Sequence, residues 1–218
     1  MRASSIQQFA SAVAVVVGTS NMTPCHAQTT AKPSDAARTV RAYVTNFGGD
    51  GISVIDPARG ELVASIKTGA KPHGVAIAPD GKTVYVSNEG DGTLCFIDPE
   101  KKAVVDRIAL GQLKFAAEGK DAHGLAVTPD GRELWISTQT GDDVTILNVS
   151  DHKTVGRVSV GRDPNWLGFT PDGQRAVVSN TGSNEVSIID AKNRRVVATV
   201  KVGPAPKRLA VGYVSVDK

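Results

Sequence analysis

Apolar and polar residues alternate along short stretches of the chain from residue 39 onward. The letters "ISVID" at residues 52–56 and "EVSIID" at residues 185–190 show the pattern. A period of two places successive side chains on opposite faces of a strand, whereas an amphipathic helix requires a period of 3.6. Because turn residues such as glycine and proline separate these stretches, the pattern predicts an all-β protein of short strands.

The predicted strands belong to a unit that occurs four times. "YVTN" begins at Tyr43, "YVSN" at Tyr85, "WIST" at Trp135 and "VVSN" at Val177, at spacings of 42, 50 and 42 residues. A second marker, "VID", "FID", "ILN" and "IID", keeps the same three intervals. A four-stranded antiparallel unit of about 42 residues has the size of one propeller blade. We therefore predict a β-propeller domain at residues 39–218 with four blades of this type.

The two ends of this domain complement each other. The first unit lacks the leading run that reads "PHGVAIA" in the second unit, and residues 206–213, "PKRLAVGY", match that run without a unit to follow. A C-terminal strand that completes the first blade would remove two open sheet edges. The sequence therefore predicts that this strand completes the first blade.

Four blades leave three arrangements open. A two-fold homodimer would make eight blades, because a half-ring exposes an apolar face at each end. A shortened monomer closed by its terminal strand and a truncated member of a larger family are the other two. The solution mass distinguishes the dimer from the monomer.

The repeated letters are similar to a known family. "YVTN", "YVSN", "ISVID" and the three "PDG" turns resemble the YVTN-repeat β-propellers, which are grouped with the propellers of haem-d nitrite reductase and the amine dehydrogenase heavy chain. The resemblance covers about residues 39–213 and implies the fold. It specifies function poorly, because the family includes binding proteins and redox-enzyme domains. Family propellers usually have about seven blades, whereas this chain encodes four.

The N-terminal segment predicts export. Residues 1–27 combine Arg2, an apolar run at residues 9–18 and small residues near Ala27, which is typical of a secretory signal peptide. An apolar run of about ten residues is too short for a membrane helix, which needs about twenty, so no membrane span is predicted. With residues 28–38 as a linker, we expect a mature protein in the bacterial periplasm or outside the cell.

Composition narrows the partners. The chain is 40% hydrophobic and 22% charged, which is typical of a folded protein, and its formal net charge of +3 gives no support for a nucleic-acid partner. Of its two cysteines, Cys25 lies in the predicted signal peptide. Cys95 is then without a disulfide partner in the mature chain, and we expect it to be a small buried residue.

One polar position recurs six residues before each "PDG" proline. We expect it to lie at one end of the central channel of the propeller, which we call the mouth. It holds His73, His123, Asn165 and, by the same offset, Lys207. These groups either line a wet channel through bonds to loop carbonyls, bind a ligand, or serve a metal or haem. Nitrogens that share one ion lie ~3–4 Å apart, whereas packed sheets lie roughly 10 Å apart. No metal site and no cofactor are therefore predicted.

Two further features adjoin this position. The segment 110–124 is longer than its counterpart in the first unit and carries Lys114 and Phe115, which either contact a ligand or partner protein or belong to a solvated insertion. Trp166 replaces the glycine of the other units, so its ring either reaches the mouth or is buried between blades.

No catalytic motif is found. The mature chain has no GxSxG, HExxH, CxxC or phosphate-loop sequence, so catalytic residues stay unknown and an enzyme is the less favoured interpretation. The sequence-based hypothesis is a secreted or periplasmic binding or assembly module that engages a protein or small ligand through the mouth. The alternative is an accessory subunit of a haem or quinone redox enzyme, or a lactonase-like hydrolase.

Overall fold

A computed structural model of the protein describes residues 39–112 and 122–215. The predicted signal peptide, the predicted linker, Lys114 and Phe115 lie outside the described residues. Within them, the regular elements are strands and two single-turn 3-10 helices, Leu110–Gln112 and Gln139–Gly141. The described strands are β1 (Ala42–Asn46), β2 (Gly51–Asp56), β3 (Glu61–Lys67), β4 (Pro72–Ile77), β5 (Val84–Asn88), β6 (Thr93–Asp98), β7 (Ala103–Ala109), β8 (Ala122–Val127), β9 (Glu133–Thr138), β10 (Asp143–Asn148), β11 (Thr154–Ser159), β12 (Pro164–Phe169), β13 (Arg175–Asn180), β14 (Glu185–Asp190) and β15 (Arg195–Lys201).

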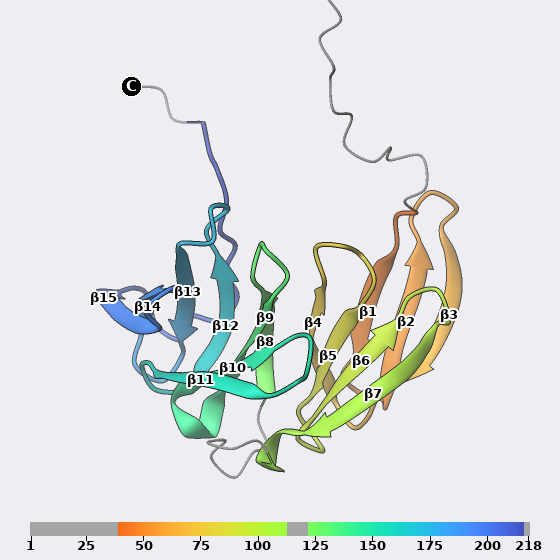
Figure 1. The fold of residues 1–218 in the computed structure, drawn as a ribbon, viewed down its shortest axis with the longest axis horizontal. Coiled ribbons are helices and arrows are strands. Elements are labelled where there is room, and N and C mark those ends of the chain that lie inside the picture. Colours follow the sequence, from red (N-terminus) through yellow and green to blue (C-terminus); the bar gives the residue numbers. More distant parts are fainter. Residues whose placement is uncertain (1–38, 113–121, 216–218) are drawn as a thin grey trace, which may run out of the picture. The chain divides into compact units, whose positions relative to one another are not determined.

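The strands form four antiparallel sheets, one for each sequence unit (Figure 1). Their orders are β1-β2-β3, β4-β5-β6-β7, β8-β9-β10-β11 and β12-β13-β14-β15, so each sheet is a simple meander. The leading strands β4, β8 and β12 lie next to one another, and β1 lies next to β4. The predicted all-β propeller of four blades is confirmed.

The hydrophobic core consists of three layers, each between two consecutive blades. Period-two alternation explains this arrangement, because a central strand such as β5 sends side chains to both neighbours. Val84 and Val86 pack with Ile52 of the first blade, whereas Tyr85 packs with Leu134 of the third. Each such aliphatic side chain contributes about 1.5–3 kcal/mol through burial. A single blade therefore depends on its neighbours for a core.

A side-chain hydroxyl joins each blade to the next segment. It belongs to the third residue of the YVTN-type motif and donates to a backbone carbonyl of the following unit. The bonds run from Thr45 Oγ1 to His73 O at 3.1 Å, from Ser87 Oγ to His123 O at 3.0 Å, from Ser137 Oγ to Asn165 O at 2.8 Å, and from Ser179 Oγ to Lys207 O. We call these four contacts the hydroxyl bridges.

The close approach at the hydroxyl bridges requires glycine in the middle blades. A Cβ on Gly74 would lie 2.1 Å from the carbonyl oxygen of His123, and a Cβ on Gly124 would lie 2.8 Å from that of Asn165. Both separations are shorter than nonbonded contacts allow. The "HG" pairs of the second and third units are thereby explained by backbone packing.

The C-terminal segment corrects one prediction. The first sheet has three strands, and residues 202–215 carry no strand assignment. Residues 206–211 pack on the fourth blade instead. Thr181 Oγ1 donates to the carbonyl of Pro206 at 2.7 Å, and Gly168 lies beside Leu209 and Val211. The predicted completion of the first blade is therefore wrong for the described residues, because residues 202–215 form no strand that pairs with β1. The hydroxyl bridge from Ser179 places the segment beside the fourth blade.

Loss of one hydroxyl bridge is expected to destabilise the fold. Ser137→Ala removes the acceptor of the Gly124 amide and the donor to the Asn165 carbonyl, both of which are buried. Unsatisfied buried groups cost about 1–3 kcal/mol each, so we expect the free energy of unfolding to fall by about 2 kcal/mol or more. Urea unfolding measures this, with Ser159→Ala on the exposed side of β11 as the control. Equal stabilities of the two variants would contradict the role of the bridge.

Candidate functional site

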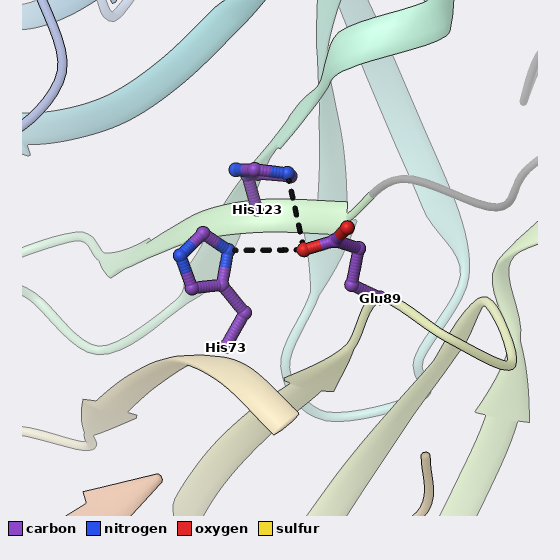
Figure 2. Close-up of side chains that lie close together, drawn as sticks. All are labelled: His73, Glu89 and His123. Carbon is purple, nitrogen blue, oxygen red and sulfur yellow. Dashed lines mark ion pairs between the residues drawn. The ribbon is translucent and has the colours of Figure 1, made fainter. Parts of the chain in front are cut away.

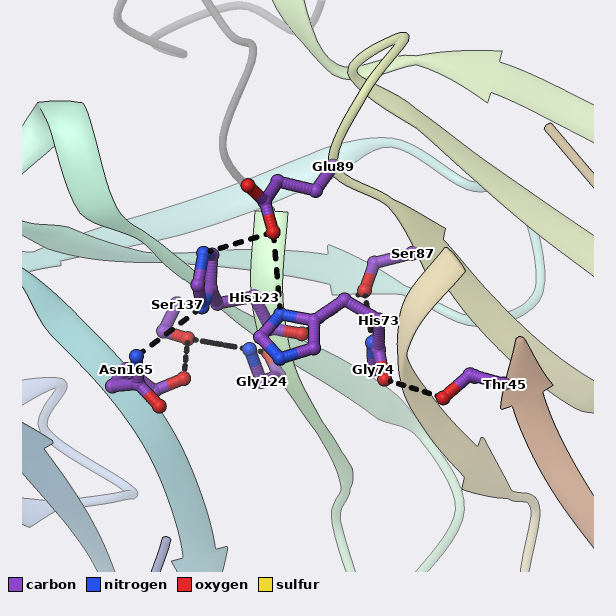
Figure 3. A network of polar contacts seen from close by, with 9 residues as sticks. All are labelled: Thr45, His73, Gly74, Ser87, Glu89, His123, Gly124, Ser137 and Asn165. Atoms are coloured by element: carbon purple, nitrogen blue, oxygen red, sulfur yellow. Dashed lines mark hydrogen bonds and ion pairs between the residues drawn. The ribbon is translucent and has the colours of Figure 1, made fainter. Parts of the chain in front are cut away.

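Three of the four predicted mouth residues come together. His73, His123 and Asn165 lie at the starts of β4, β8 and β12 (Figure 3). The ring centroids of the two histidines are 4.3 Å apart, and Asn165 Nδ2 lies 3.3 Å from His123 Nδ1. His123 and Asn165 are buried, with exposed fractions of 7% and 5%. The fourth residue, Lys207, contributes its charge, which lowers the pKa of both histidines.

A local irregularity turns these side chains toward one another. The pairing of β4, β8 and β12 with the next strand shifts register at the second and third residues of each strand. There the amide of Gly74, Gly124 or Trp166 donates to the serine hydroxyl of its own blade, at 2.9, 2.8 and 3.1 Å. Bulges of this kind re-aim a side chain. The repeated serine thus positions the repeated polar residue.

Glu89 is a site residue that the sequence analysis missed. Its Oε2 lies 3.6 Å from His73 Nδ1 and 3.4 Å from His123 Nε2 (Figure 2). It follows the "YVSN" motif at the end of β5, and its amide donates to the carbonyl of Lys71 at 3.0 Å. One feature of the sequence could have identified Glu89. The same position carries Phe47, Gln139 and Thr181 in the other units, so an acid occurs there once.

The separation expected between the two histidines was wrong. A sheet spacing of roughly 10 Å applies to the body of packed blades. The leading strands approach more closely, since a Cβ on Gly74 would lie 2.1 Å from the carbonyl oxygen of His123, and the two ring centroids are 4.3 Å apart. The argument against a shared ion therefore does not apply to this pair.

Aromatic and cationic side chains surround the cluster. The ring of His73 lies 5.8 Å from that of Phe47 and 6.4 Å from that of Trp166. The guanidinium of Arg208 lies 4.6 Å from the Trp166 ring centroid, and the Lys71 ammonium lies 5.7 Å from that of Phe47. Trp166 is half-buried beside His73 and does not belong to the core layer between the third and fourth blades. These aromatic and cationic side chains, which we call the rim, offer flat apolar surfaces beside positive charge.

Burial keeps both imidazoles neutral. Desolvation, followed by the charges of His73, Lys207 and Arg208, lowers the pKa of His123 to about 4. Desolvation also lowers the pKa of His73, although Glu89 acts in the opposite direction. At neutral pH the contacts of Glu89 are therefore contacts to uncharged rings. Neutral imidazole is the form that accepts a proton or binds a metal.

One atom of the cluster is unsatisfied. His73 Nδ1 is buried without a hydrogen-bond partner, because its distance of 3.6 Å to Glu89 is too long for a hydrogen bond. A buried polar atom in this state costs about 1–3 kcal/mol. This atom lies within the polar cluster that His73, Glu89, His123 and Asn165 form.

Other notable features lie away from this cluster. A cleft of about 530 Å³ is lined by Pro129, Arg132 and Arg194, among others, on the side where the "PDG" turns lie. Arg194 in this cleft is already bound to other protein groups, since it pairs with Glu133 and its guanidinium also donates to the Val155 carbonyl. His152 lies 2.7 Å from Asp106 and stacks on Phe96, so it belongs to neither region. Within the described residues, no helix is long and apolar enough to span a bilayer.

The low pKa of His123 makes stability depend on pH. The unfolded chain takes up a proton near the ordinary pKa of 6.5, whereas folded His123 takes it up only near 4. Stability from this group is complete above pH 6.5 and is lost as the pH falls toward 4, by about 3 kcal/mol. Urea unfolding at pH 7 and pH 4.5 should show a smaller difference for His123→Asn than for the wild type. An NMR titration in which every histidine has a pKa near 6.5 would contradict the assignment.

Comparison with solved structures supports the fold. Hydrazine synthase from Kuenenia stuttgartiensis matches with a TM-score of 0.65 and 20% identity, over 73% of this chain and 45% of that chain. A functionally unknown protein from Desulfotomaculum acetoxidans matches with a TM-score of 0.63 and 19% identity, over 75% and 53%. The chain thus spans about half the length of these two solved chains. At such identities the likeness shows the fold alone.

Comparison of sequences gives the family. No curated protein sequence matches the chain significantly. The family model described as YNCE-like beta-propeller matches residues 3–120, which is more than half of the chain. This match agrees with the YVTN-type repeats and with the four antiparallel blades. The chain therefore belongs to the YNCE-like beta-propeller family.

Proposed function

We propose that this protein is a periplasmic or secreted binding module whose mouth accepts a small ligand with a carboxylate and a flat apolar part. The observation that carries the proposal is the buried, unsatisfied Nδ1 of His73 within the polar cluster. Side chains from the second, third and fourth blades converge there. A protein partner, the other ligand considered from the sequence, would contact the same face.

Charge beside the cluster favours an anionic ligand. Lys207 and Arg208 lie close enough to lower the pKa of both histidines further, after desolvation, and Lys71 lies over the ring of Phe47. A carboxylate is bound well by an arginine fork, which donates two parallel hydrogen bonds. Trp166 and Phe47 supply aromatic faces for the apolar part of the ligand.

Export is the part of the proposal that rests on sequence. Residues 1–27 have the features of a signal peptide, and a mature protein outside the cytoplasm would meet small organic acids from the surroundings. The redox alternative makes a different prediction. A visible absorbance band of haem or quinone in the protein purified from its own host would favour that alternative over the binding module.

Benzoate tests the ligand class, with uncharged benzamide as its matched control. Trp135 is fully buried and donates to Glu133 at 2.9 Å, so a fluorescence change on binding should come from Trp166. We expect saturable quenching by benzoate and a much weaker response to benzamide. Trp166→Phe should abolish the fluorescence change.

Calorimetry of the same pair measures the charge contribution. Arg208→Gln should weaken benzoate binding about tenfold, because a hydrogen bond to a charged group contributes about 1.5–3 kcal/mol. Arg195→Gln, an exposed position on β15, serves as the control and should bind as the wild type does. Equal affinity for benzoate and benzamide, or no binding of either, would count against the proposed ligand class.

A further inference from the structure

We infer that His73, Glu89 and His123 bind one divalent transition-metal ion, with zinc as the best fit, through His73 Nδ1, Glu89 Oε2 and His123 Nε2. The inference deepens the proposed function, since the ion would lie at the same mouth and hold the carboxylate of the ligand.

The distances fit one small ion. The three ligand atoms lie within 4.8 Å of one another, with 3.6 Å from His73 Nδ1 to Glu89 Oε2 and 3.4 Å from His123 Nε2 to the same oxygen (Figure 2). Ligands about 2.0–2.1 Å from a tetrahedral zinc ion lie about 3.3–3.4 Å from each other. Small side-chain rotations therefore bring all three atoms to bonding distance.

The chemistry of the donors fits as well. Two imidazoles and a carboxylate suit zinc better than magnesium or calcium, which prefer oxygen ligands. Zinc binds imidazole in its neutral form and glutamate as the carboxylate. A bond to His73 Nδ1 would also satisfy the buried atom that has no partner.

Asn165 is suited to a supporting role. Metal-bound histidines usually donate their other ring N–H to a nearby acceptor, which fixes the ring orientation. Asn165 lies 3.3 Å from His123 Nδ1 through its amide nitrogen, and a half-turn of the amide would present the oxygen instead (Figure 3). His123 Nδ1–H would then donate to Asn165 Oδ1 while Nε2 binds the ion.

Three protein ligands leave the fourth position of a tetrahedral zinc ion open. Sites with two histidines and one glutamate are typical of zinc ions that bind water or substrate rather than of closed structural sites. Arg208, held over the ring of Trp166, lies at the same mouth. A ligand carboxylate would place one oxygen on the ion and meet the guanidinium with the other.

Zinc titration of the chelator-treated, metal-free protein tests the site, with Zn²⁺ alone as the probe. We expect one Zn²⁺ per chain by calorimetry, and an affinity at least 100-fold lower for Glu89→Gln and for His123→Ala. Glu89→Gln keeps the shape of the side chain, so circular dichroism should confirm an unchanged fold. His152→Ala is the matched histidine control and should bind as the wild type does, because His152 pairs with Asp106 instead. Absence of saturable binding, or equal affinities of Glu89→Gln and the wild type, would overturn the inference.

Asn165 gives a separate test of ligand orientation. Asn165→Ala should weaken zinc binding about 10- to 100-fold, as losses of supporting residues do. Asn165→Asp should restore it, because a carboxylate can accept a hydrogen bond from His123 Nδ1–H. Zinc affinity that is equal in the alanine variant and the wild type would contradict the supporting role.

The two proposals fail in different ways. Benzoate binding in the presence of EDTA, together with no zinc binding, would overturn the metal site and leave the binding module in place. Zinc binding without any benzoate binding, in either the metal-free or the zinc-loaded protein, would support the metal site and contradict the proposed ligand class.

Discussion

The hydroxyl bridges determine both the fold and the candidate site. In each unit a serine or threonine hydroxyl donates to a carbonyl of the next unit, and the carbonyls belong to His73, His123, Asn165 and Lys207. These are the residues at the mouth. Their backbone oxygens hold neighbouring segments together, which leaves the side chains free for binding. The bridge occurs at the same motif position in every unit. The mouth residues of successive units therefore occupy equivalent positions along their blades.

Desolvation then gives the cluster its chemistry. Packing of the leading strands buries His123 and Asn165 and places the imidazoles where the charged form is disfavoured. Glu89 reaches this space from the end of the neighbouring strand β5. Glu89 lies beside two neutral imidazoles, and cationic side chains lie nearby. A bound cation would satisfy the carboxylate and the imidazoles, and an anionic ligand would pair with the cationic side chains.

The loops at the two ends of the blades differ in how much their residues vary between units. At the "PDG" turns the aspartates accept hydrogen bonds from backbone amides, from Lys82 to Asp80 and from Gln174 to Asp172. A hydrogen bond from the Thr170 hydroxyl lowers the pKa of Asp172. Such repeated contacts stabilise turns. At the other end the equivalent positions vary, with Phe47, Glu89 and Trp166 each present in one unit. A rigid scaffold with variable loops is the usual setting of binding sites.

The sequence by itself determined the blade unit, its strands and the row of His73, His123 and Asn165, because period-two alternation and a fixed offset from the "PDG" turn are local properties. It could not determine which loop residue reaches that row. Glu89 joins the site, and the two imidazoles approach to 4.3 Å, only through packing between blades. The place of residues 206–211 was likewise decided by tertiary contacts, because the local pattern predicts a strand but does not determine whether that strand pairs with β1. In the structure the segment contacts the fourth blade through the bond from Ser179 and does not pair with β1.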